Sequence, residues 1–431
     1  MMRKIAALLC ALTLISFSAL AEAHYCVATD KNVLLVFESG EAIDLSSAWS
    51  DIYCIREDAL YAVGLARDGR MRYALCDVNG RLLTEPVYAS LSAAQGGVLF
   101  QIDGVYGWMD ESGKEAIPAD YTQLVPAGGG AFYALLTNPN DDQADQIYCV
   151  DVSGASVSSG VWTTIPLSEP SDGRMPFCEQ GTALYGYLDS NGAIAIAPQF
   201  EYAGKFSGGL ANAVQNGKHG LIDTSGEWVL QPEYSYIAEG ESFYVALKDH
   251  SACIVFDADG KTELFRLEEA NLEVAAVGGA IVAVNAESLR IYDRTGALRR
   301  TCATNAAVVE GARGQLILSE GDWGSQTVRI IDESGAKIDR VDQHLIPLDD
   351  ERYAFVSMNV ALYNSDILGG TRYSVNYDSL RVGMIDRTGR EIVPAEYEEI
   401  RAVGENRYLL ISESALILCN EEGKTIWQKN L

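Results

Sequence analysis

The feature that most constrains this 431-residue chain is an Asp, once an Asn, that is followed three residues later by a Gly and recurs ten times. The copies of this tetrad begin at Asp77, Asp110, Asp151, Asp189, Asp223, Asp257, Asp293, Asp332, Asp386 and Asn420. Successive copies are 33 to 41 residues apart, except for a gap of 54 residues between Asp332 and Asp386. A period of this size indicates a repeat protein, in which each unit buries its apolar face against its neighbours.

Five copies align without a gap over sixteen residues: YALCDVNGRLLTEPVY from Tyr73, YGWMDESGKEAIPADY from Tyr106, YGYLDSNGAIAIAPQF from Tyr185, HGLIDTSGEWVLQPEY from His219 and VGMIDRTGREIVPAEY from Val382. In each copy an aromatic residue falls eleven positions after the Asp, and a Pro precedes that aromatic by two or three positions. An Asp that accepts a hydrogen bond from the backbone two residues on, with a Gly in the left-handed conformation, predicts a type I hairpin turn. Because Pro cannot donate to a sheet ladder, we expect it to end the second strand.

These five copies resemble the bacterial WG-repeat family, also called KWG repeats, and Gly107 with Trp108 supplies the naming dipeptide in reversed order. The resemblance covers most of residues 70–430. The copies at Asp151, Asp257, Asp293, Asp332 and Asn420 keep the turn but lose the Pro and aromatic half, and Gly40 marks a weaker eleventh copy. The resemblance implies a β-propeller-like binding scaffold and brings no catalytic residues.

Three or four strands per period is the size of a propeller blade. We therefore expect an all-β repeat array of short β-hairpin units, β-propeller-like in one or two rings, or an open superhelical β array. The expected organisation is a signal peptide at residues 1–23, an N-terminal β segment with a degenerate repeat at 24–69, and a WG-type array at 70–431. An insertion at residues 359–381 accounts for the long gap.

The first 23 residues are typical of a cleavable signal peptide, with Arg3 and Lys4 before an apolar run at residues 5–20. Ala21, Glu22 and Ala23 form a small-x-small site, which predicts cleavage after Ala23. No second apolar run of transmembrane length follows. We therefore expect a secreted or envelope-associated protein that does not insert into a membrane after cleavage.

The formal net charge of −28 disfavours nucleic acid and anionic polymers as partners, and is compatible with peptides, basic proteins or neutral glycans. Four cysteines lie in apolar runs before a tetrad, which favours buried free thiols over a full disulfide set: Cys76, Cys149, Cys253 and Cys419. The oxygen-rich loop at residues 138–145 does not match a calcium loop. No CxxC, HExxH, GxSxG or phosphate-loop motif is present, so the sequence predicts no metal site, no cofactor and no nucleophile elbow.

Four connections are read as longer than the rest, at residues 66–72, 137–145, 320–326 and 359–381. They occupy the same place in the repeat, so we expect them on one face, where repeat scaffolds commonly bind. The candidate ligand-binding residues in these connections are aromatic and acidic: Tyr363, Asp366, Tyr373, Tyr377, Asp378 and Trp323.

Three functions fit these observations. The first is a non-catalytic, secreted or envelope-associated scaffold that binds protein, peptide or glycan through the variable loops. The second is an extracellular glycosidase of the propeller type, which needs two converging carboxylates. The third is an exported spacer or a partner in a surface assembly. Turn formation is a sufficient explanation for each repeated Asp, which favours the first function over the second.

Overall fold

The structure is a computed structural model that describes residues 24–29, 32–37, 41–56, 60–77, 80–136, 145–158, 160–163, 167–249, 252–269, 272–321, 327–331, 344–364 and 371–431, with only the backbone at residues 24, 162, 358–364 and 371–379. The described residues form strands, turns and bends, with no helix. Their 40 strands make eleven antiparallel sheets. The predicted fold class, an all-β and β-propeller-like repeat array, is confirmed. The predicted signal peptide at residues 1–23 lies outside the described residues.

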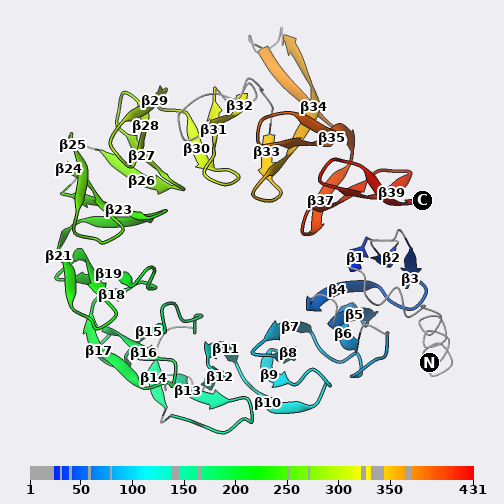
Figure 1. The fold of residues 1–431 in the computed structure, drawn as a ribbon, viewed down its shortest axis with the longest axis horizontal. Helices are drawn as coiled ribbons and strands as arrows, with labels where there is room; N and C mark the ends of the chain where they lie inside the picture. Colours follow the sequence, from blue (N-terminus) through cyan, green and yellow to red (C-terminus); the bar gives the residue numbers. More distant parts are fainter. Residues whose placement is uncertain are drawn as a thin grey trace. The chain divides into compact units, whose positions relative to one another are not determined.

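The chain divides into two units between Pro232 and Glu233. The strands that begin in the first unit are β1 (His24–Ala28), β2 (Val33–Phe37), β3 (Ala42–Asp44), β4 (Asp51–Arg56), β5 (Leu60–Arg67), β6 (Arg70–Asp77), β7 (Ser90–Ala94), β8 (Gly97–Ile102), β9 (Val105–Met109), β10 (Glu115–Tyr121), β11 (Gln123–Gly128), β12 (Ala131–Leu136), β13 (Asp145–Asp151), β14 (Val161–Thr163), β15 (Arg174–Cys178), β16 (Tyr185–Asp189), β17 (Ile194–Phe200), β18 (Tyr202–Ala203), β19 (Leu210–Gln215), β20 (Lys218–Asp223) and β21 (Trp228–Tyr234). They form six sheets of three or four strands that follow one another in chain order (Figure 1).

The strands of the second unit are β22 (Tyr236–Gly240), β23 (Phe243–Lys248), β24 (Ala252–Asp257), β25 (Glu263–Glu268), β26 (Glu273–Val277), β27 (Ala280–Val284), β28 (Leu289–Asp293), β29 (Leu298–Cys302), β30 (Ala307–Glu310), β31 (Leu316–Glu320), β32 (Thr327–Ile331), β33 (His344–Pro347), β34 (Arg352–Asn364), β35 (Thr371–Asp386), β36 (Glu391–Tyr397), β37 (Glu399–Gly404), β38 (Arg407–Ile411), β39 (Ala415–Asn420) and β40 (Thr425–Asn430). They form five sheets, again in chain order. Among the described residues of both units, no helix has the length and apolar character needed to span a bilayer.

Each four-stranded sheet has two ends with different turns. In the sheet β26–β29, Val277 pairs with Ala280 and Ala280 pairs with Asp293, so the first turn and the tetrad turn lie at one end. We call this end of a sheet the tetrad rim. The other end, where the second strand connects to the third, is the opposite rim. The four connections predicted to be long all join second and third strands, and their described residues therefore belong to the opposite rim.

The tetrad turn, with a positive-φ Gly whose N–H donates to the carbonyl oxygen of the first residue, is confirmed at nine of the ten copies, and the copy at Asp332 lies outside the described residues. Within the part of the chain that the structure describes, the Asp or Asn side chain accepts from the N–H two residues on in seven of the nine, as predicted. Gly226 has a φ of +90°, and its N–H donates to the carbonyl oxygen of Asp223 over 2.9 Å. The side-chain Oδ1 of Asp223 accepts from the backbone N–H groups of Ser225 at 2.9 Å and Glu227 at 3.1 Å. One carboxylate oxygen therefore satisfies two turn donors that would otherwise need water.

The position predicted for the repeat Pro is wrong in four of the five aligned copies, Pro86 of the first copy lying outside any strand. Pro198 lies inside β17 rather than at its end, and Pro118, Pro232 and Pro394 lie inside β10, β21 and β36. The register shifts around it, because Tyr187 pairs with Ile196 while Tyr185 pairs with Phe200. The edge strand bulges at the Pro and then resumes pairing at the aromatic residue, so the missing N–H costs no ladder bond.

The bulge explains the Gly that precedes each of these tetrads by three residues. A Cβ on Gly186 would lie 2.5 Å from the carbonyl oxygen of Ile196 and 2.8 Å from the nitrogen of Pro198. A Cβ on Gly220 would likewise lie 2.6 Å from the carbonyl oxygen of Leu230 and 2.9 Å from the nitrogen of Pro232. The bulged backbone lies close against the strand that ends in the tetrad, and only Gly leaves room for it.

The hydrophobic core lies between successive sheets within each unit. In the second unit, Leu318 of β31 is fully buried in a cluster that also holds Leu289 and Ile291 of β28. A separate cluster joins Tyr353 and Phe355 of β34 to Ile317 and Ile330 of the preceding sheet. Each sheet is therefore stabilised by its neighbours in the chain, as expected for a repeat protein.

The prediction of a long connection at residues 66–72 is wrong. Arg67 pairs with Arg70, so β5 and β6 continue to a two-residue turn at Asp68 and Gly69, where φ is +52° and +74°. Positive φ at both central residues is typical of the tight type I′ hairpin. Arg67 and Arg70 of this segment are exposed at the ends of two paired strands.

Candidate functional site

The residues predicted to bind a ligand are only partly described. Tyr363 lies in β34, and Tyr373, Tyr377 and Asp378 lie in β35, where the structure describes the backbone alone. Asp366 and Trp323 lie outside the described residues. Their joint role in binding stays a prediction.

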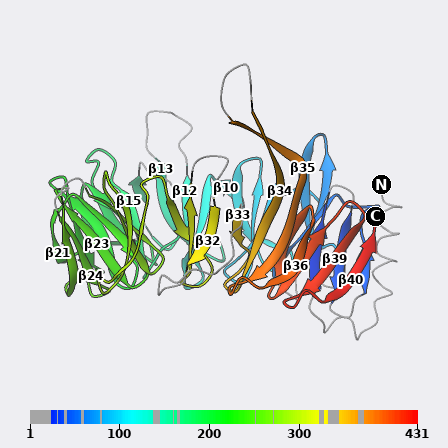
Figure 2. The same cartoon turned by 90° about the horizontal axis from the view of Figure 1, so that it is seen from above.

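The insertion that carries most of these residues is largely strand rather than loop. β34 and β35 remain paired from Arg352 and Asp386 out to Asn364 and Thr371, with one register shift between Ser357 and Asn359. Figure 2 shows these two strands extending beyond their neighbours in the second unit. We call residues 357–364 and 371–381 the ribbon. It projects from the opposite rim of its sheet.

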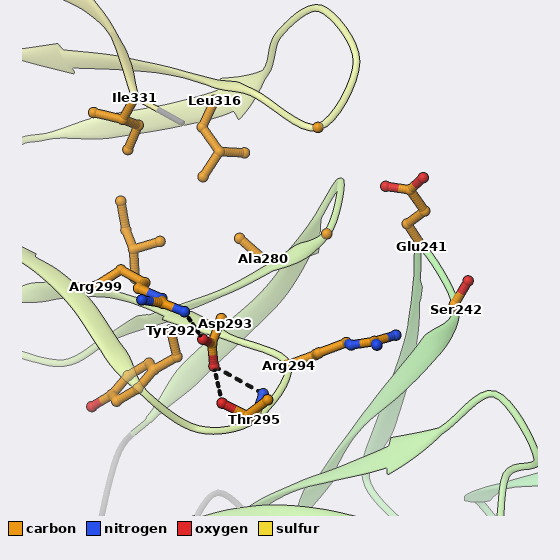
Figure 3. A pocket seen from close by; sticks show the side chains of 13 residues that line it. Glu241, Ser242, Ala280, Tyr292, Asp293, Arg294, Thr295, Arg299, Leu316 and Ile331 are labelled. Atoms are coloured by element: carbon orange, nitrogen blue, oxygen red, sulfur yellow. Dashed lines mark hydrogen bonds and ion pairs between the residues drawn. The ribbon is translucent and has the colours of Figure 1, made fainter. Parts of the chain in front are cut away.

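A cavity of about 360 Å³ lies at the tetrad rim of the sheet β26–β29 (Figure 3). Three successive sheets contribute to it, all of them in the second unit: Glu241, Ser242, Gly279, Ala280, Ile291, Tyr292, Asp293, Arg294, Thr295, Arg299, Gly314, Leu316 and Ile331. Its volume is in the range of small-molecule sites in proteins. It is not among the sites that the sequence predicted, and it lies at the rim that does not carry the variable connections.

The cavity opens because one turn has no side chains. The turn between β26 and β27 consists of Gly278 and Gly279, and a Cβ on Gly279 would have nothing nearer than Glu241 Oε2 at 3.7 Å. On the far side, the next sheet presents Leu316 and Ile331. The space between these turns and strands is therefore left open.

The cavity has an apolar side and a polar side. Figure 3 shows the aliphatic side chains of Leu316 and Ile331 facing the tetrad turn across the open space. The polar side carries Asp293, Arg294 and Thr295 of the tetrad and Ser242 of the β22–β23 turn. A ligand with one apolar part and a few polar groups fits such a lining.

Asp293 is fully engaged in holding its turn. Its Oδ1 accepts from the N–H and hydroxyl of Thr295 at 2.9 and 2.7 Å and from the N–H of Ala297 at 3.0 Å, and its Oδ2 pairs with Arg299. Burial alone would raise the pKa of this carboxyl group, but the hydrogen bonds outweigh burial and hold the pKa below its ordinary value. Asp293 is therefore an ionised structural group rather than a proton donor.

Two charged groups of the cavity are left for a ligand. Arg294 extends across the cavity toward the turn that carries Glu241 and Ser242 (Figure 3). Arg294 and Glu241 are both exposed and form no ion pair with each other among the residues drawn. A guanidinium and a carboxylate therefore face the same open space without neutralising each other.

The remaining candidate groups are structural. Cys76, Cys149, Cys253 and Cys419 are buried, as predicted, and all eight cysteines from Cys26 onward are free. Burial raises the pKa of Cys149 and Cys419 to about 11, so these thiols are protonated and unreactive at neutral pH. Within the described residues, no three His, Cys, Asp or Glu side chains are placed to hold a metal ion.

Sequence reasoning missed the cavity because it searched for insertions, whereas the cavity comes from a missing side chain. The sequence holds only a partial signal, whose meaning depends on which turns face each other in space. The two adjacent glycines at 278 and 279 precede the strand AIVAV, and the tetrad of the same repeat contains Arg294. A side-chain-free turn beside a charged turn is the pattern that marks the site.

Comparison with known proteins supports the repeat assignment. The family model described as WG containing repeat matches residues 185–218, 220–244 and 383–410, so the chain contains WG repeats at three places. The search of curated proteins found no match.

Three solved structures are similar to the chain at low TM-scores and low sequence identity. Hsv2p from Kluyveromyces lactis is 9% identical, with 59% of this chain and 97% of that chain covered and a TM-score of 0.32. BamB from Moraxella catarrhalis is 12% identical, with 73% and 90% covered and a TM-score of 0.26. AztD from Citrobacter koseri, in its apo form, is 12% identical, with 66% and 95% covered and a TM-score of 0.31.

Proposed function

We propose that this protein is an exported, non-catalytic repeat scaffold that binds a peptide or glycan ligand, and that the ligand occupies the cavity at the tetrad rim. The observation that carries the proposal is the open space of about 360 Å³ with unpaired charges on one side and aliphatic side chains on the other. A propeller-like repeat fold is consistent with a scaffold or binding role. The leader-like segment at residues 1–23 supports export.

The glycosidase alternative receives less support from the same site. A general acid in such an enzyme needs a carboxyl group with a raised pKa, and a partner carboxylate at a fixed separation. The cavity carboxyl group of Asp293 has its pKa shifted downward, and its oxygens are occupied by Thr295, Ala297 and Arg299. Binding without catalysis is the function that this arrangement favours.

The ribbon remains a second proposed binding region, because repeat scaffolds commonly bind through insertions. The two regions lie at opposite rims of their sheets and can be altered separately. A ribbon-shortened variant replaces residues 358–380 by Asn-Gly, a dipeptide suited to a tight hairpin, so that Ser357 still pairs with Arg381. A cavity-closed variant is Gly279→Glu, which adds a side chain where a Cβ has room.

The test is a binding screen on the mature chain from His24 onward, using mixtures of short peptides and of oligosaccharides with retained compounds identified by mass spectrometry. We expect at least one compound to be retained by the unmodified and ribbon-shortened proteins and lost from Gly279→Glu. Circular dichroism and thermal melting establish that each variant is folded. Retention by the cavity-closed variant and loss from the ribbon-shortened one would move the site to the ribbon. Retention of nothing by the folded, unmodified chain would overturn the proposal.

A further inference from the structure

The same tetrapeptide, Asp-Arg-Thr-Gly, forms two of the tetrad turns in the second unit, at residues 293–296 and 386–389. The two turns have the same internal bonds. Asp386 Oδ1 accepts from Thr388 N–H at 2.9 Å, Thr388 hydroxyl at 2.6 Å and Arg390 N–H at 3.0 Å, as Asp293 does from its own turn. Arg387 therefore occupies the same position in its turn as Arg294, so the surroundings of the two arginines can be compared directly.

Arg387 has a carboxylate partner in the turn beside it, Glu351, which also pairs with Arg313 over 3.0 Å. Arg387 Nη1 lies 3.6 Å from Glu351 Oε1, and Arg387 Nη2 donates to the carbonyl oxygen of Arg313 over 3.3 Å. Glu351 immediately precedes β34, whose first residue, Arg352, pairs with Asp386. The residue just before the second strand therefore supplies the carboxylate for the arginine of the tetrad turn.

In the cavity sheet the equivalent of Glu351 is Gly279. It immediately precedes β27, whose first residue, Ala280, pairs with Asp293. Arg294 consequently lacks the partner that Arg387 has, and the place of the missing carboxylate is part of the cavity. A ligand carboxylate can take that place, because a guanidinium binds carboxylates through paired hydrogen bonds.

Glu241 restricts which carboxylates are suitable. Its Oε2 lies over Gly279, 3.7 Å from the position of a Cβ, so it is beside the place that the ligand anion would occupy. A purely anionic ligand would be repelled by Glu241 and by the net charge of −28. An ammonium group on the same ligand would instead be attracted to the Glu241 carboxylate, so a ligand that carries both charges is favoured.

We infer that the cavity binds a zwitterionic α-amino-carboxylate with an aliphatic side chain, either a free amino acid or a short peptide. Arg294 binds the carboxylate, Glu241 binds the ammonium group, and Leu316 and Ile331 contact the aliphatic part. This inference rests on the binding role and the cavity of the proposed function, and it extends the proposed peptide ligand to single amino acids. Both charged residues are exposed, so recognition depends on the ligand carrying the two charges together.

The test is a calorimetric titration of the mature chain with four probes: L-leucine, the dipeptide Leu-Leu, N-acetyl-leucine and leucinamide. We expect binding of L-leucine or Leu-Leu, with at least tenfold weaker binding of the two probes that lack one charge. Leucine alone would identify a free amino acid site, and Leu-Leu alone a peptide site. Equal binding of N-acetyl-leucine and L-leucine, or binding of none of the four, would overturn the inference.

Three variants test whether Arg294 and Glu241 bind the two charged groups of the ligand. Arg294→Gln should weaken binding of L-leucine or Leu-Leu at least tenfold, and so should Glu241→Gln. Arg387→Gln is the matched control, because it removes the same side chain from the same tetrapeptide outside the cavity and should leave the affinity unchanged. Equal effects of Arg294→Gln and Arg387→Gln would contradict the assignment. If an uncharged oligosaccharide from the screen occupies the cavity instead, the proposed function stands and this inference fails.

Discussion

At the scale of single residues, two positions of the repeat are fixed by backbone geometry. The Asp of the tetrad satisfies the turn donors, and the Gly three residues before it makes room for the bulge. The first role could be predicted from sequence, because an Asp-x-x-Gly turn is a local structure. The second could not, because the atoms that would clash with a Cβ on Gly186 belong to the next strand.

Gly186→Ala tests the bulge. The added Cβ would contact backbone atoms of Ile196 and Pro198 that cannot move without breaking the strand pairing. We expect a loss of about 1–3 kcal/mol in the free energy of unfolding, the usual cost of overpacking, measured by chemical denaturation. Gly279→Ala is the control for stability, since its Cβ has ordinary space. Equal stability of the two variants would show that the bulge does not require Gly.

The tetrad aspartates make stability depend on pH. Hydrogen bonds from Ser225 and from the backbone lower the pKa of Asp223 below its ordinary value. A carboxyl group with a lower pKa in the folded state stabilises the protein above the unfolded-state pKa of about 3.9, and this contribution is lost as the pH falls through the folded-state pKa.

Asp223→Asn should therefore be less stable than the unmodified protein at pH 7, with the difference shrinking as the pH falls from about 5 to about 2. The amide can hold the turn, because Asn420 Oδ1 accepts from Glu422 and Lys424 N–H groups at 3.1 and 2.9 Å in its own copy. The measurement is denaturant unfolding across this pH range. The reverse variant, Asn420→Asp, should gain the same pH dependence. A difference that does not change with pH would contradict the role of the charge.

At the scale of elements, two segments predicted from their length to be connections are largely paired strands in the structure. Residues 66–72 and 359–381 are both read from sequence as longer connections, and the second accounts for the 54-residue gap between tetrads. In the structure, residues 66–72 and the described part of 359–381 continue paired strands. The Asp-Gly at 68 and 69 is a strong local hairpin signal, so the first could have been predicted, whereas the paired length of the ribbon depends on contacts between distant residues.

Contacts between sheets rely on buried tyrosine hydroxyls. Tyr353 of β34 donates to Gln315 Oε1 over 2.9 Å and accepts from Ala312 N–H at 2.7 Å, which joins its sheet to the turn before β31. Tyr353→Phe would leave this buried N–H without a partner. We expect a loss of about 1–3 kcal/mol in the free energy of unfolding. Tyr202, whose side chain is exposed, provides the control. Tyr202→Phe should change the free energy of unfolding by less than about 0.5 kcal/mol. Similar effects of the two substitutions would argue against the link.

At the scale of the whole molecule, the period in the sequence predicts the architecture, since it indicates repeated units that bury their apolar faces against neighbours. The core clusters found between successive sheets agree with it. The candidate site could not be predicted in the same way. It depends on which turn faces Arg294 in space, and the glycines at 278 and 279 acquire that meaning only when three sheets are placed side by side.

Leu318→Ala tests how far a defect spreads in the second unit. Leu318 is fully buried between the sheet β26–β29 and the sheet of β30, β31 and β32, so the substitution should cost about 2–5 kcal/mol. We expect faster amide hydrogen exchange in these two sheets and little change in β37–β40. Uniformly faster exchange throughout the unit would contradict stabilisation by nearest neighbours.

The most direct test of the central claim, that the binding site is the cavity left by the side-chain-free turn, is one titration of Leu-Leu into three folded proteins. These are the unmodified mature chain, the ribbon-shortened variant and Gly279→Glu, in which a carboxylate is restored beside Arg294 as Glu351 stands beside Arg387. Equal affinity for the first two and no binding by the third is the predicted result. Binding that survives Gly279→Glu and disappears when the ribbon is shortened would contradict the claim.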